Sequence, residues 1–419
     1  MMLLLIPLKT TSHLDLQTSL SNWVDTSRQF YSSTQIKNDI QRLHSLRSDI
    51  ADVICTRTSH AYAYDNKSNN NQTLSDLMEY HACLVACTEQ GFPTSGRDAK
   101  VNGTIDADLQ FSWKNAFGDE EENLLSEETK SHFGYEIVCV LWNIAALLSY
   151  KAATMQDWST KEGLSAVKKD YETAALIFRH IQEILVKADT KGNAITSDLT
   201  DASLNMCRYM CLAQGQICLY EVLKMKLDTA STAAAYRLIA QIASGIADLY
   251  DHALRSSQDS VIKFLDSSEM YGAHFKTLSM LYRARAEFLQ SMVERNSDQF
   301  GMEIARLHRC REMLREANEF TRSNEMKSKN LIVGPASLGK STLDVLQSLR
   351  ESVKQRLIVI TQDNKSIYHE KIPSDAMIPK IVSKDMVSNN ICNDSGELID
   401  LPKEYMPESL YRPMFDSVS

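Results

Sequence analysis

A glycine-rich stretch late in the sequence has the spacing of a phosphate-binding P-loop. Gly334, Gly339, Lys340 and Ser341 occupy the fixed positions of the pattern G-x-x-x-x-G-K-S, between the apolar Leu331–Val333 and a helical pattern. In such a loop, backbone amides surround phosphates, the lysine reaches the terminal phosphates and the serine ligates Mg²⁺. A P-loop fold also needs a parallel sheet whose strands alternate with helices, and only about 85 residues follow the first glycine. We therefore interpret the stretch as a loop whose serine caps the next helix, and keep a P-loop ATPase as an alternative function.

Nine cysteines are the second group of residues with possible chemistry. The pairs Cys83/Cys87 and Cys207/Cys211 are spaced four residues apart, which places each pair on one face of a helix. A zinc site would also need further histidine or cysteine ligands at zinc-like spacing, and none is evident. The sequence therefore predicts buried free thiols in a reducing compartment, with no metal and no cofactor.

The composition predicts a helical globular protein. The chain has 419 residues, 43% of them hydrophobic, with only 14 glycines and 8 prolines to interrupt helices. A net charge of −9 gives no indication of nucleic-acid binding. The apolar opening Met1–Lys9 lacks the basic region and cleavage site of a secretory signal, so we expect a first strand there. No run of 18 consecutive apolar residues occurs, and no membrane span is predicted.

Hydrophobic periodicity predicts a succession of helices. The stretch Phe133–Tyr150 is almost continuously apolar, interrupted mainly by Glu136 and Asn143, so it should form a helix buried on most sides. Helices are predicted over residues 38–50, 77–87, 133–154, 161–187, 200–227, 230–256, 258–296, 300–322 and 341–357. From residue 133 onward they form an irregular tandem array similar to tetratricopeptide stacking, because no strict repeat is present.

The remaining segments are predicted to be loops, strands or extended chain. Residues 64–73 are polar and rich in asparagine, which indicates a mobile loop, and residues 90–107 form a second loop. Residues 109–117 alternate apolar and polar side chains, so we expect a strand that pairs with the N-terminal one. The acidic residues 118–130 are predicted to be a solvated connector. Prolines from residue 358 onward predict an extended tail.

Five segments, in the same order along the chain, resemble one family. They are Ile6–Lys9 with His13–Leu16, Phe111–Phe117, Gly134–Ala146, Phe300–Leu307 and Asp363–Pro373. The last of these resembles the family's hallmark before its C-terminal extension. Together they cover nearly the whole chain, and the sequence resembles the Bro domain (BRO-one domain) of the ALIX / Rim-type ESCRT-associated adaptor family.

The resemblance implies both a fold and a function. The expected fold is mainly α, a curved, boomerang-shaped tetratricopeptide-like helical solenoid with a small N-terminal β-sheet and an extended C-terminal tail. A single domain over residues 1–419 is expected, divided into 1–130, 131–357 and 358–419. The implied function is that of a non-enzymatic adaptor in endosomal sorting and multivesicular body formation. It would bind the C-terminal amphipathic helix of an ESCRT-III subunit of the charged multivesicular body protein class. Such a protein is cytoplasmic, is recruited to endosomal membranes through its partners, and does not bind nucleic acid.

The resemblance also implies where the partner helix docks. The family's apolar patch falls on Leu219, Leu238 and Ile242, all of which are apolar here. Leu238 and Ile242 are four residues apart and therefore share one helix face, with Leu219 on the preceding helix. The alternative interpretation from periodicity alone is that all three are ordinary core residues. Lys161 and Ser165 fall where relatives carry an acidic and a basic residue beside the docked helix, which puts partner choice in doubt.

Two further alternatives follow from the same residues. A general helical scaffold for other peptides would have the same fold without affinity for ESCRT-III tails. Tyr368, near the end of the hallmark segment, is interpreted as a structural residue whose ring packs and whose hydroxyl forms hydrogen bonds, with phosphorylation as the alternative.

Overall fold

The computed structural model describes residues 3–26, 34–55, 67–89, 110–117, 127–130, 133–154, 157–187, 196–227, 231–259, 266–324, 332–333 and 342–387. The chain forms two compact units. Unit 1 comprises residues 1–5, 149–175 and 205–397, and unit 2 comprises residues 6–148, 176–204 and 398–419. The predicted mainly helical fold is confirmed, whereas the assignment of residues 1–419 to a single domain stays a prediction.

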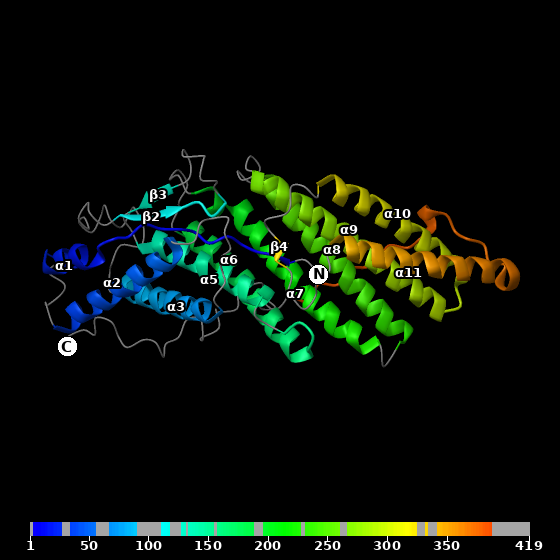
Figure 1. The fold of residues 1–419 in the computed structure, drawn as a ribbon, viewed down its shortest axis with the longest axis horizontal. Helices are drawn as coiled ribbons and strands as arrows, with labels where there is room; N and C mark the ends of the chain where they lie inside the picture. The colour runs from blue at the N-terminus through cyan, green and yellow to red at the C-terminus, as the bar shows by residue number, and fades with distance from the viewer. Residues whose placement is uncertain are drawn as a thin grey trace. The chain divides into compact units, whose positions relative to one another are not determined.

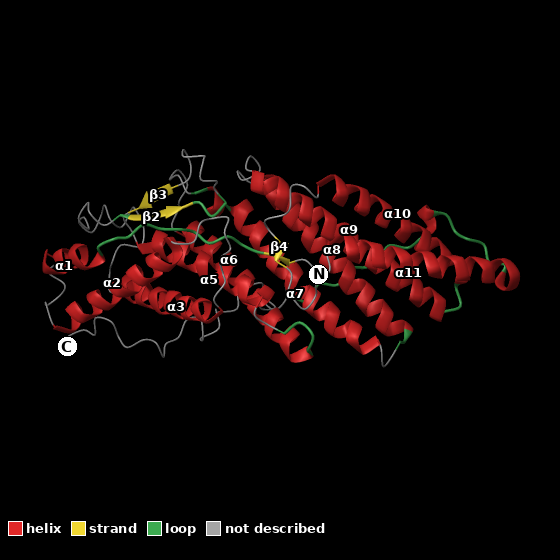
Figure 2. Ribbon diagram, in the orientation of Figure 1, coloured by secondary structure: helices red, strands yellow, loops and turns green. Residues whose placement is uncertain are grey.

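Helices account for most of the described elements (Figures 1 and 2). They are α1 (Leu16–Thr26), α2 (Thr34–Cys55), α3 (Lys67–Glu89), α5 (Phe133–Thr154), α6 (Lys161–Lys187), α7 (Asp201–Leu227), α8 (Ala233–Asp259), α9 (Asp266–Asn296), α10 (Phe300–Asn324) and α11 (Thr342–Asp363). The strands are β1 (Leu3–Leu4), β2 (Phe111–Lys114), β3 (Glu127–Lys130) and β4 (Ile332–Val333), which form the antiparallel pairs β1–β4 and β2–β3.

Side-chain caps determine where several helices begin. Helices α1, α6, α7 and α8 each begin directly after a residue whose side-chain oxygen accepts a hydrogen bond from a backbone N–H of the first turn. These residues are Asp15, Thr160, Thr200 and Thr232. Each cap satisfies a donor that has no partner within the helix, so the boundary is a local property of the sequence.

The centre of unit 2 is the apolar part of α5. This helix is long and apolar enough to cross a membrane, but 83% of its most apolar window is buried inside the protein, as expected for a core helix. Trp142 donates from its indole Nε1 to the Pro7 carbonyl oxygen at 2.9 Å and packs edge-to-face against Phe178. Asn143, which interrupts the apolar run, bonds both the N–H and the carbonyl of Lys9, so the N-terminal chain is held against this helix.

Glu136, the other polar residue of that run, is a buried acceptor for three donors in unit 2. Its carboxylate accepts hydrogen bonds from Arg47 Nε at 2.7 Å, Tyr80 hydroxyl at 3.0 Å and Trp113 Nε1 at 2.5 Å. Strand β2, which carries Trp113, pairs with β3 and also meets the N-terminal chain, through a bridge between Thr11 and Trp113 and a hydrogen bond from the Lys114 N–H to the Thr10 carbonyl. A buried carboxylate is tolerated here because it is paired and fully hydrogen-bonded.

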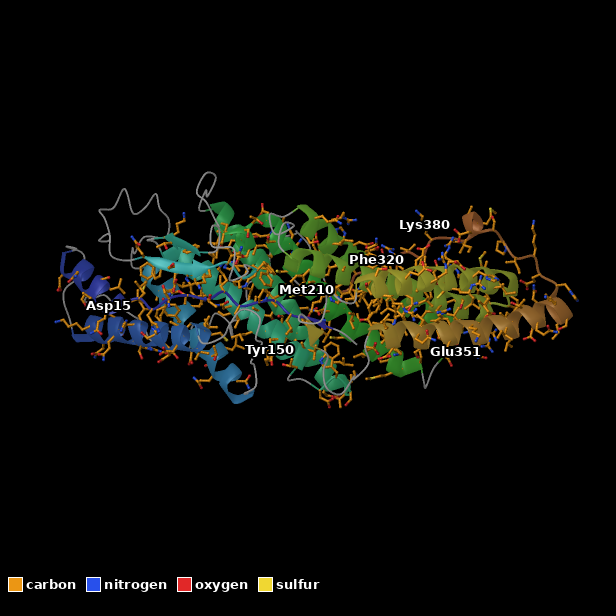
Figure 3. All side chains as sticks on the ribbon, turned by 45° about the horizontal axis from the view of Figure 1, so that its top comes forward. Asp15, Tyr150, Met210, Phe320, Glu351 and Lys380 are labelled. Carbon is orange, nitrogen blue, oxygen red and sulfur yellow. The ribbon has the colours of Figure 1, made fainter. Side chains whose placement is uncertain are left out.

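Helices α8 to α11 of unit 1 lie side by side in sequence order (Figure 1). Side chains fill the spaces between them (Figure 3), and of the residues labelled there Met210 is buried whereas Glu351 and Lys380 are exposed. Gln214 of α7 bonds the N–H and the carbonyl of Leu4, and Tyr271 of α9 donates to the Leu5 carbonyl at 2.6 Å. The first residues of the chain are therefore anchored to this helical array.

The chain reverses direction after α11. One π-helical turn, Asn364–Tyr368, ends at His369, whose φ of 56° is left-handed. The carboxylate of Glu370 then accepts the Gly301 N–H at the start of α10, at 2.7 Å. A side chain at Gly301 would place its Cβ 2.4 Å from the Lys371 carbonyl oxygen, so only glycine leaves room for this approach. Two of the segments that carry the family resemblance, around residues 300–307 and 363–373, therefore pack against each other.

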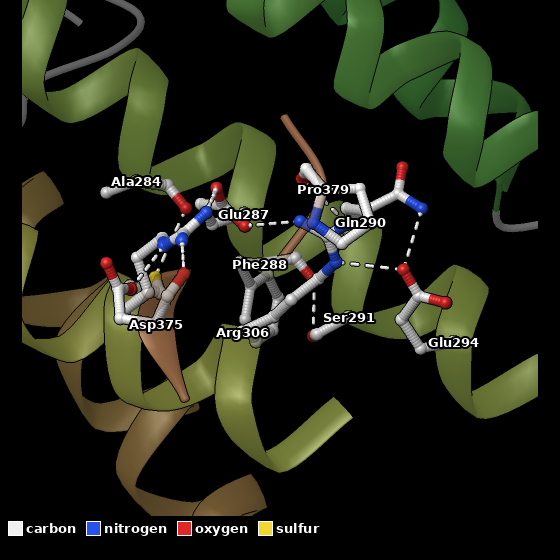
Figure 4. Close-up of polar contacts among 11 residues, drawn as sticks. Ala284, Glu287, Phe288, Gln290, Ser291, Glu294, Arg306, Asp375 and Pro379 are labelled. Carbon is white, nitrogen blue, oxygen red and sulfur yellow. Dashed lines mark hydrogen bonds and ion pairs between the residues drawn. The ribbon is translucent and has the colours of Figure 1, made fainter. Parts of the chain in front are cut away.

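Residues 369–387, here called the C-terminal segment, run over the array without regular structure apart from the short turn Asp375–Met377. An ion-pair cluster on α9 and α10 holds it (Figure 4). Arg306 bonds Glu287 and Glu294, both at 2.8 Å, and donates to the Pro379 carbonyl at 3.2 Å. Arg309 forms ion pairs with Glu287 of α9 and with Asp375 of the C-terminal segment. The extended course of this part of the tail is confirmed.

Several sequence predictions need correction. The predicted loop 64–73 is helical from Lys67, where α3 begins, and the predicted connector 118–130 contains β3. Strand β2 was expected to pair with the N-terminal strand, but β1 pairs with β4 instead. Helix α11 continues beyond residue 358, where the extended tail was expected to begin. The second predicted loop, residues 90–107, lies outside the described residues.

Candidate functional site

The three predicted patch residues differ in their exposure. Leu219 on α7 and Leu238 on α8 are partly exposed, as a docking surface requires. Ile242, four residues after Leu238 on α8, is only 1% exposed. The expectation that Ile242 is uncovered is therefore wrong, and the exposed part of the patch is narrower than predicted.

Hydrogen bonding fixes the level at which α7 and α8 meet. Gln216 Nε2 on α7 donates to the Ile242 carbonyl on α8 at 3.2 Å. Helix α8 begins shortly after α7 ends and runs back along it (Figure 1). The two helices are therefore antiparallel. Leu219 lies about one turn after Gln216 on α7, and Leu238 lies about one turn before Ile242 on α8, so the two leucines are at the same level. The two partly exposed leucines belong to one surface of this helix pair.

Ile242 is buried at the level where the C-terminal segment crosses the two helices. Lys384 donates its N–H to the Gln241 carbonyl at 3.0 Å and accepts Gln216 Nε2 at 2.9 Å. Val387 lies 3.4 Å from the point where a Cβ on Gly215 would stand. The crossing joins residues far apart in sequence, so neither helical periodicity nor spacing could have predicted it.

Two more residues extend the apolar surface and were missed by sequence reasoning. Leu223 lies four residues after Leu219 on α7 and is partly exposed, and Ala234 lies four residues before Leu238 on α8 and is exposed. Because the helices are antiparallel, Leu223 and Ala234 are also level with each other. We define the docking patch as Leu219, Leu223, Ala234 and Leu238. The i, i+4 spacing of apolar residues on both helices was the signal that could have found them.

The predicted rim residues, Lys161 and Ser165, are both exposed on the first turns of α6. Ser165 donates its hydroxyl to the Lys161 carbonyl at 2.9 Å. The place where a Gly215 Cβ would stand lies 3.5 Å from Tyr171 Cβ, so α6 and α7 are adjacent at that level. Ser165 is nearly two turns before Tyr171 on α6, and Leu219 is about one turn after Gly215 on α7, so Ser165 and Leu219 lie within about one turn of each other. An exposed place on the helix next to α7 is compatible with a rim, and the part of Lys161 and Ser165 in binding stays a prediction.

The described residues give no support to the two other candidate sites, the P-loop and a metal site. Gly334, Gly339, Lys340 and Ser341 lie outside them, and the preceding strand β4 belongs to an antiparallel pair with β1. Both sheets in the described part are two-stranded and antiparallel, unlike the parallel sheet that a P-loop fold requires. The described ranges also contain no group of three or more histidine, cysteine, aspartate or glutamate residues that could hold a metal.

The cysteines whose placement is described are buried free thiols, as predicted. They are Cys83, Cys87, Cys139, Cys207, Cys211, Cys218 and Cys310. Burial raises the pKa of Cys83 to about 11, so its thiol stays protonated at neutral pH. A buried, protonated thiol is neither a nucleophile nor a metal ligand, and these residues act as small apolar core residues.

Comparison with known proteins gives relatives of similar fold. The chain is 27% identical to the programmed cell death 6-interacting protein of Rattus norvegicus, over 73% of this chain and 32% of that protein. It is 23% identical to the vacuolar protein-sorting protein BRO1 of Gibberella zeae, over 90% of this chain and 34% of that protein. A solved structure described as an ALIX BRO1 CHMP4C complex superposes with a TM-score of 0.68 at 22% identity, covering 96% of this chain and 99% of that one.

This chain spans only about a third of the length of those two curated relatives. The structural likeness, at 22% identity, shows a shared fold. The family model described as BRO1-like domain matches residues 3–418, which is almost the full sequence. The predicted family is therefore confirmed: this chain belongs to the BRO1-like domain family.

Proposed function

We propose that this chain is a non-enzymatic adaptor module whose docking patch binds the C-terminal amphipathic helix of an ESCRT-III subunit of the charged multivesicular body protein class. Binding would recruit or activate ESCRT-III at endosomal membranes during endosomal sorting and multivesicular body formation. In this proposal the protein acts in the cytoplasm and reaches endosomes through its partners.

One observation carries the proposal. Leu219 and Leu238 remain partly exposed and level with each other on adjacent helices, in a family member whose fold matches that of a BRO1 domain described in complex with CHMP4C. Large apolar side chains left open on a helix pair suit the apolar stripe of an amphipathic helix, which presents residues at i, i+3, i+4 and i+7. Leu223 and Ala234 lengthen the surface by one turn along each helix.

The decisive measurement is the affinity for a fluorescein-labelled peptide of the CHMP4C C-terminal helix, followed by fluorescence anisotropy. Leu219→Asp and Leu238→Asp should each weaken binding at least about ten-fold, because each places a charge in the centre of an apolar contact. Ile242→Asp is unsuitable, since that side chain is buried and its replacement would disturb the fold.

A matched control is Val359→Asp on α11. Val359 is an aliphatic side chain, 49% exposed and outside the docking patch, so this variant should bind the peptide as wild type does. Unchanged affinity in folded Leu219→Asp and Leu238→Asp variants would rule out the patch. Absence of wild-type affinity for the C-terminal helices of all charged multivesicular body protein subunits would favour the alternative of a general peptide scaffold.

A further inference from the structure

A cavity of about 690 Å³ lies within unit 1. The end of α7, the start of α8, the middle of α9, the first half of α11 and the turn before α6 line it. Its walls are largely apolar and include four aromatic side chains: Trp158, Tyr220, Tyr236 and Phe288. None of the docking-patch residues lines it. Pockets that enclose small organic ligands have this size, with apolar walls and few polar groups.

Arg285 of α9 is the distinctive polar group of this cavity, here called the Arg285 cavity. Its guanidinium carbon lies 4.8 Å from the ring centroid of Tyr282 and 5.5 Å from that of Tyr220. The Nη1 atom is enclosed and has no hydrogen-bond partner within the described part of the chain. Buried donors in folded proteins are normally paired, and an unpaired charged donor is costly. The orphaned Nη1 is thus an independent sign that something else completes this site.

The charges around the cavity favour an anion. Its lining contains one acidic residue, Glu221, and two basic residues, Lys224 and Arg285. Glu221 forms an ion pair with Lys224 at 3.3 Å, near the solvent, where the lysine side chain is 54% exposed. Glu221 also acts electrostatically on Arg285, but the guanidinium still keeps one N–H, at Nη1, without an acceptor among the described residues, and it stays protonated in proteins. Carboxylates and phosphates match its planar array of donors.

We propose that the Arg285 cavity binds an amphipathic organic anion, with a carboxylate or phosphate head group on Arg285 and an aliphatic or aromatic body against the aromatic walls. The head group would supply the acceptor that Nη1 lacks, and the body would remove apolar surface from water. The cavity shares no residue with the docking patch, so the proposal does not depend on the proposed partner-helix function.

The test is isothermal titration calorimetry of the full chain with four probes below their aggregation concentrations. Octanoate and octyl phosphate carry the two head groups, octanol has the same body without charge, and inorganic phosphate has no body. We expect one or both octyl anions to bind at least about ten-fold tighter than octanol and than inorganic phosphate. The comparison of octanoate with octyl phosphate identifies the preferred head group.

Two variants and one control locate the binding. Arg285→Met should abolish the preference for the anion over octanol. Ser348→Trp changes an exposed residue of α11 that lines the cavity, so it should fill the space and abolish binding without unfolding the chain. Arg283→Met is the control, because Arg283 sits two residues earlier on α9, pairs with Asp248 and Asp251, and does not line the cavity.

Circular dichroism establishes that each variant is folded. Failure of both anions to bind wild type overturns the proposal, as does equal affinity for octanol. Undiminished anion binding by folded Ser348→Trp overturns it as well, and this variant decides the matter if Arg285→Met does not fold. Equal losses in Arg283→Met and Arg285→Met would show that only general surface charge is involved.

Discussion

The side chain of Gln216 bonds the backbone of Lys384, 168 residues away in sequence, through a hydrogen bond of 2.9 Å from its Nε2 to the carbonyl oxygen. Its Oε1 accepts the Met386 N–H at 2.9 Å, and its Nε2 also reaches the Ile242 carbonyl at 3.2 Å. One buried amide therefore joins α7, α8 and the C-terminal segment, with both of its polar atoms satisfied. The docking patch begins about one turn away from this contact, at Leu219 on α7 and Leu238 on α8.

Gly245→Ala should loosen that crossing. A Cβ at this position would stand 2.4 Å from the Lys384 carbonyl oxygen and 2.5 Å from Gln216 Nε2, so the C-terminal segment must shift. Hydrogen exchange measured by mass spectrometry should be roughly ten-fold faster at the Lys384 and Met386 amides, which are hydrogen-bonded in the wild type.

Gly272→Ala on α9 is the matched control for this substitution. Its nearest neighbours would be 3.6 and 3.8 Å from the new Cβ, which is ordinary van der Waals contact. Alanine at a helical glycine should then raise the free energy of unfolding by about 0.5–1 kcal/mol and leave exchange in the C-terminal segment unchanged. Wild-type exchange in Gly245→Ala would contradict the predicted displacement.

Arg306→Met should destabilise unit 1 strongly. The guanidinium is 3% exposed and pairs with Glu287 and Glu294, which would lose a buried counter-charge (Figure 4). Removing one partner of a buried ion pair costs about 3–5 kcal/mol, which would appear as an earlier urea transition. Arg315→Met on the same helix removes exposed pairs with Glu312 and Glu319 and should leave the transition in place. Equal effects of the two substitutions would contradict a structural role for the buried cluster.

Local sequence signals predict the helices of this chain well. Helices α5 and α6 begin and end where they were predicted, because an apolar run defines the first and the Thr160 cap begins the second. The start of α3 was missed because residues 67–73 are polar on most positions and carry little hydrophobic periodicity. Strand β3 was missed because its sequence, EETK, has no apolar alternation and depends on pairing with β2.

The candidate site was only partly predictable for a related reason. The i, i+4 spacing places Leu238 and Ile242 on one face of α8, but it cannot distinguish which of them another segment covers. Ile242 is buried and follows Gln241, whose carbonyl accepts the Lys384 N–H, and this contact between distant segments exists only in the folded chain. The enclosure of Arg285 Nη1 likewise depends on Tyr220, which comes from α7 and packs on the guanidinium beside Tyr282 of the same helix α9, so this contact cannot be recognised from local sequence.

Glu136→Gln should destabilise unit 2. Arg47 Nε and the Tyr80 hydroxyl donate to one oxygen of this buried carboxylate and Trp113 Nε1 donates to the other. A glutamine amide must turn its NH₂ toward at least one of these donors, and it also removes the negative charge that pairs with the buried Arg47. The expected loss is about 3–5 kcal/mol in urea unfolding. Glu79→Gln, in a half-buried pair with Arg42 between α2 and α3, should cost less than about 1 kcal/mol.

Two buried histidines should make the protein less stable in mild acid. Burial lowers the pKa of His81 to about 4 and that of His274 to about 4, and among the described residues neither His81 Nδ1 nor His274 Nε2 has a hydrogen-bond partner. The unfolded chain binds protons at these residues below about pH 6.5, whereas the folded chain does not until about pH 4. Stability should therefore fall as the pH drops through this window, by up to about 1.4 kcal/mol per pH unit for each histidine, and stay level above it.

Urea unfolding at about pH 7.5 and about pH 5 measures this dependence. His81→Leu and His274→Leu should each reduce the difference in unfolding free energy between the two pH values, because leucine cannot take up a proton in the unfolded chain. His13→Leu is the control, since the side chain of His13 is 60% exposed, unlike those of the two buried histidines. A pH difference that stays at the wild-type value in both buried-site variants would show that other groups bind the protons, and His81 and His274 would then have no part in the acid sensitivity.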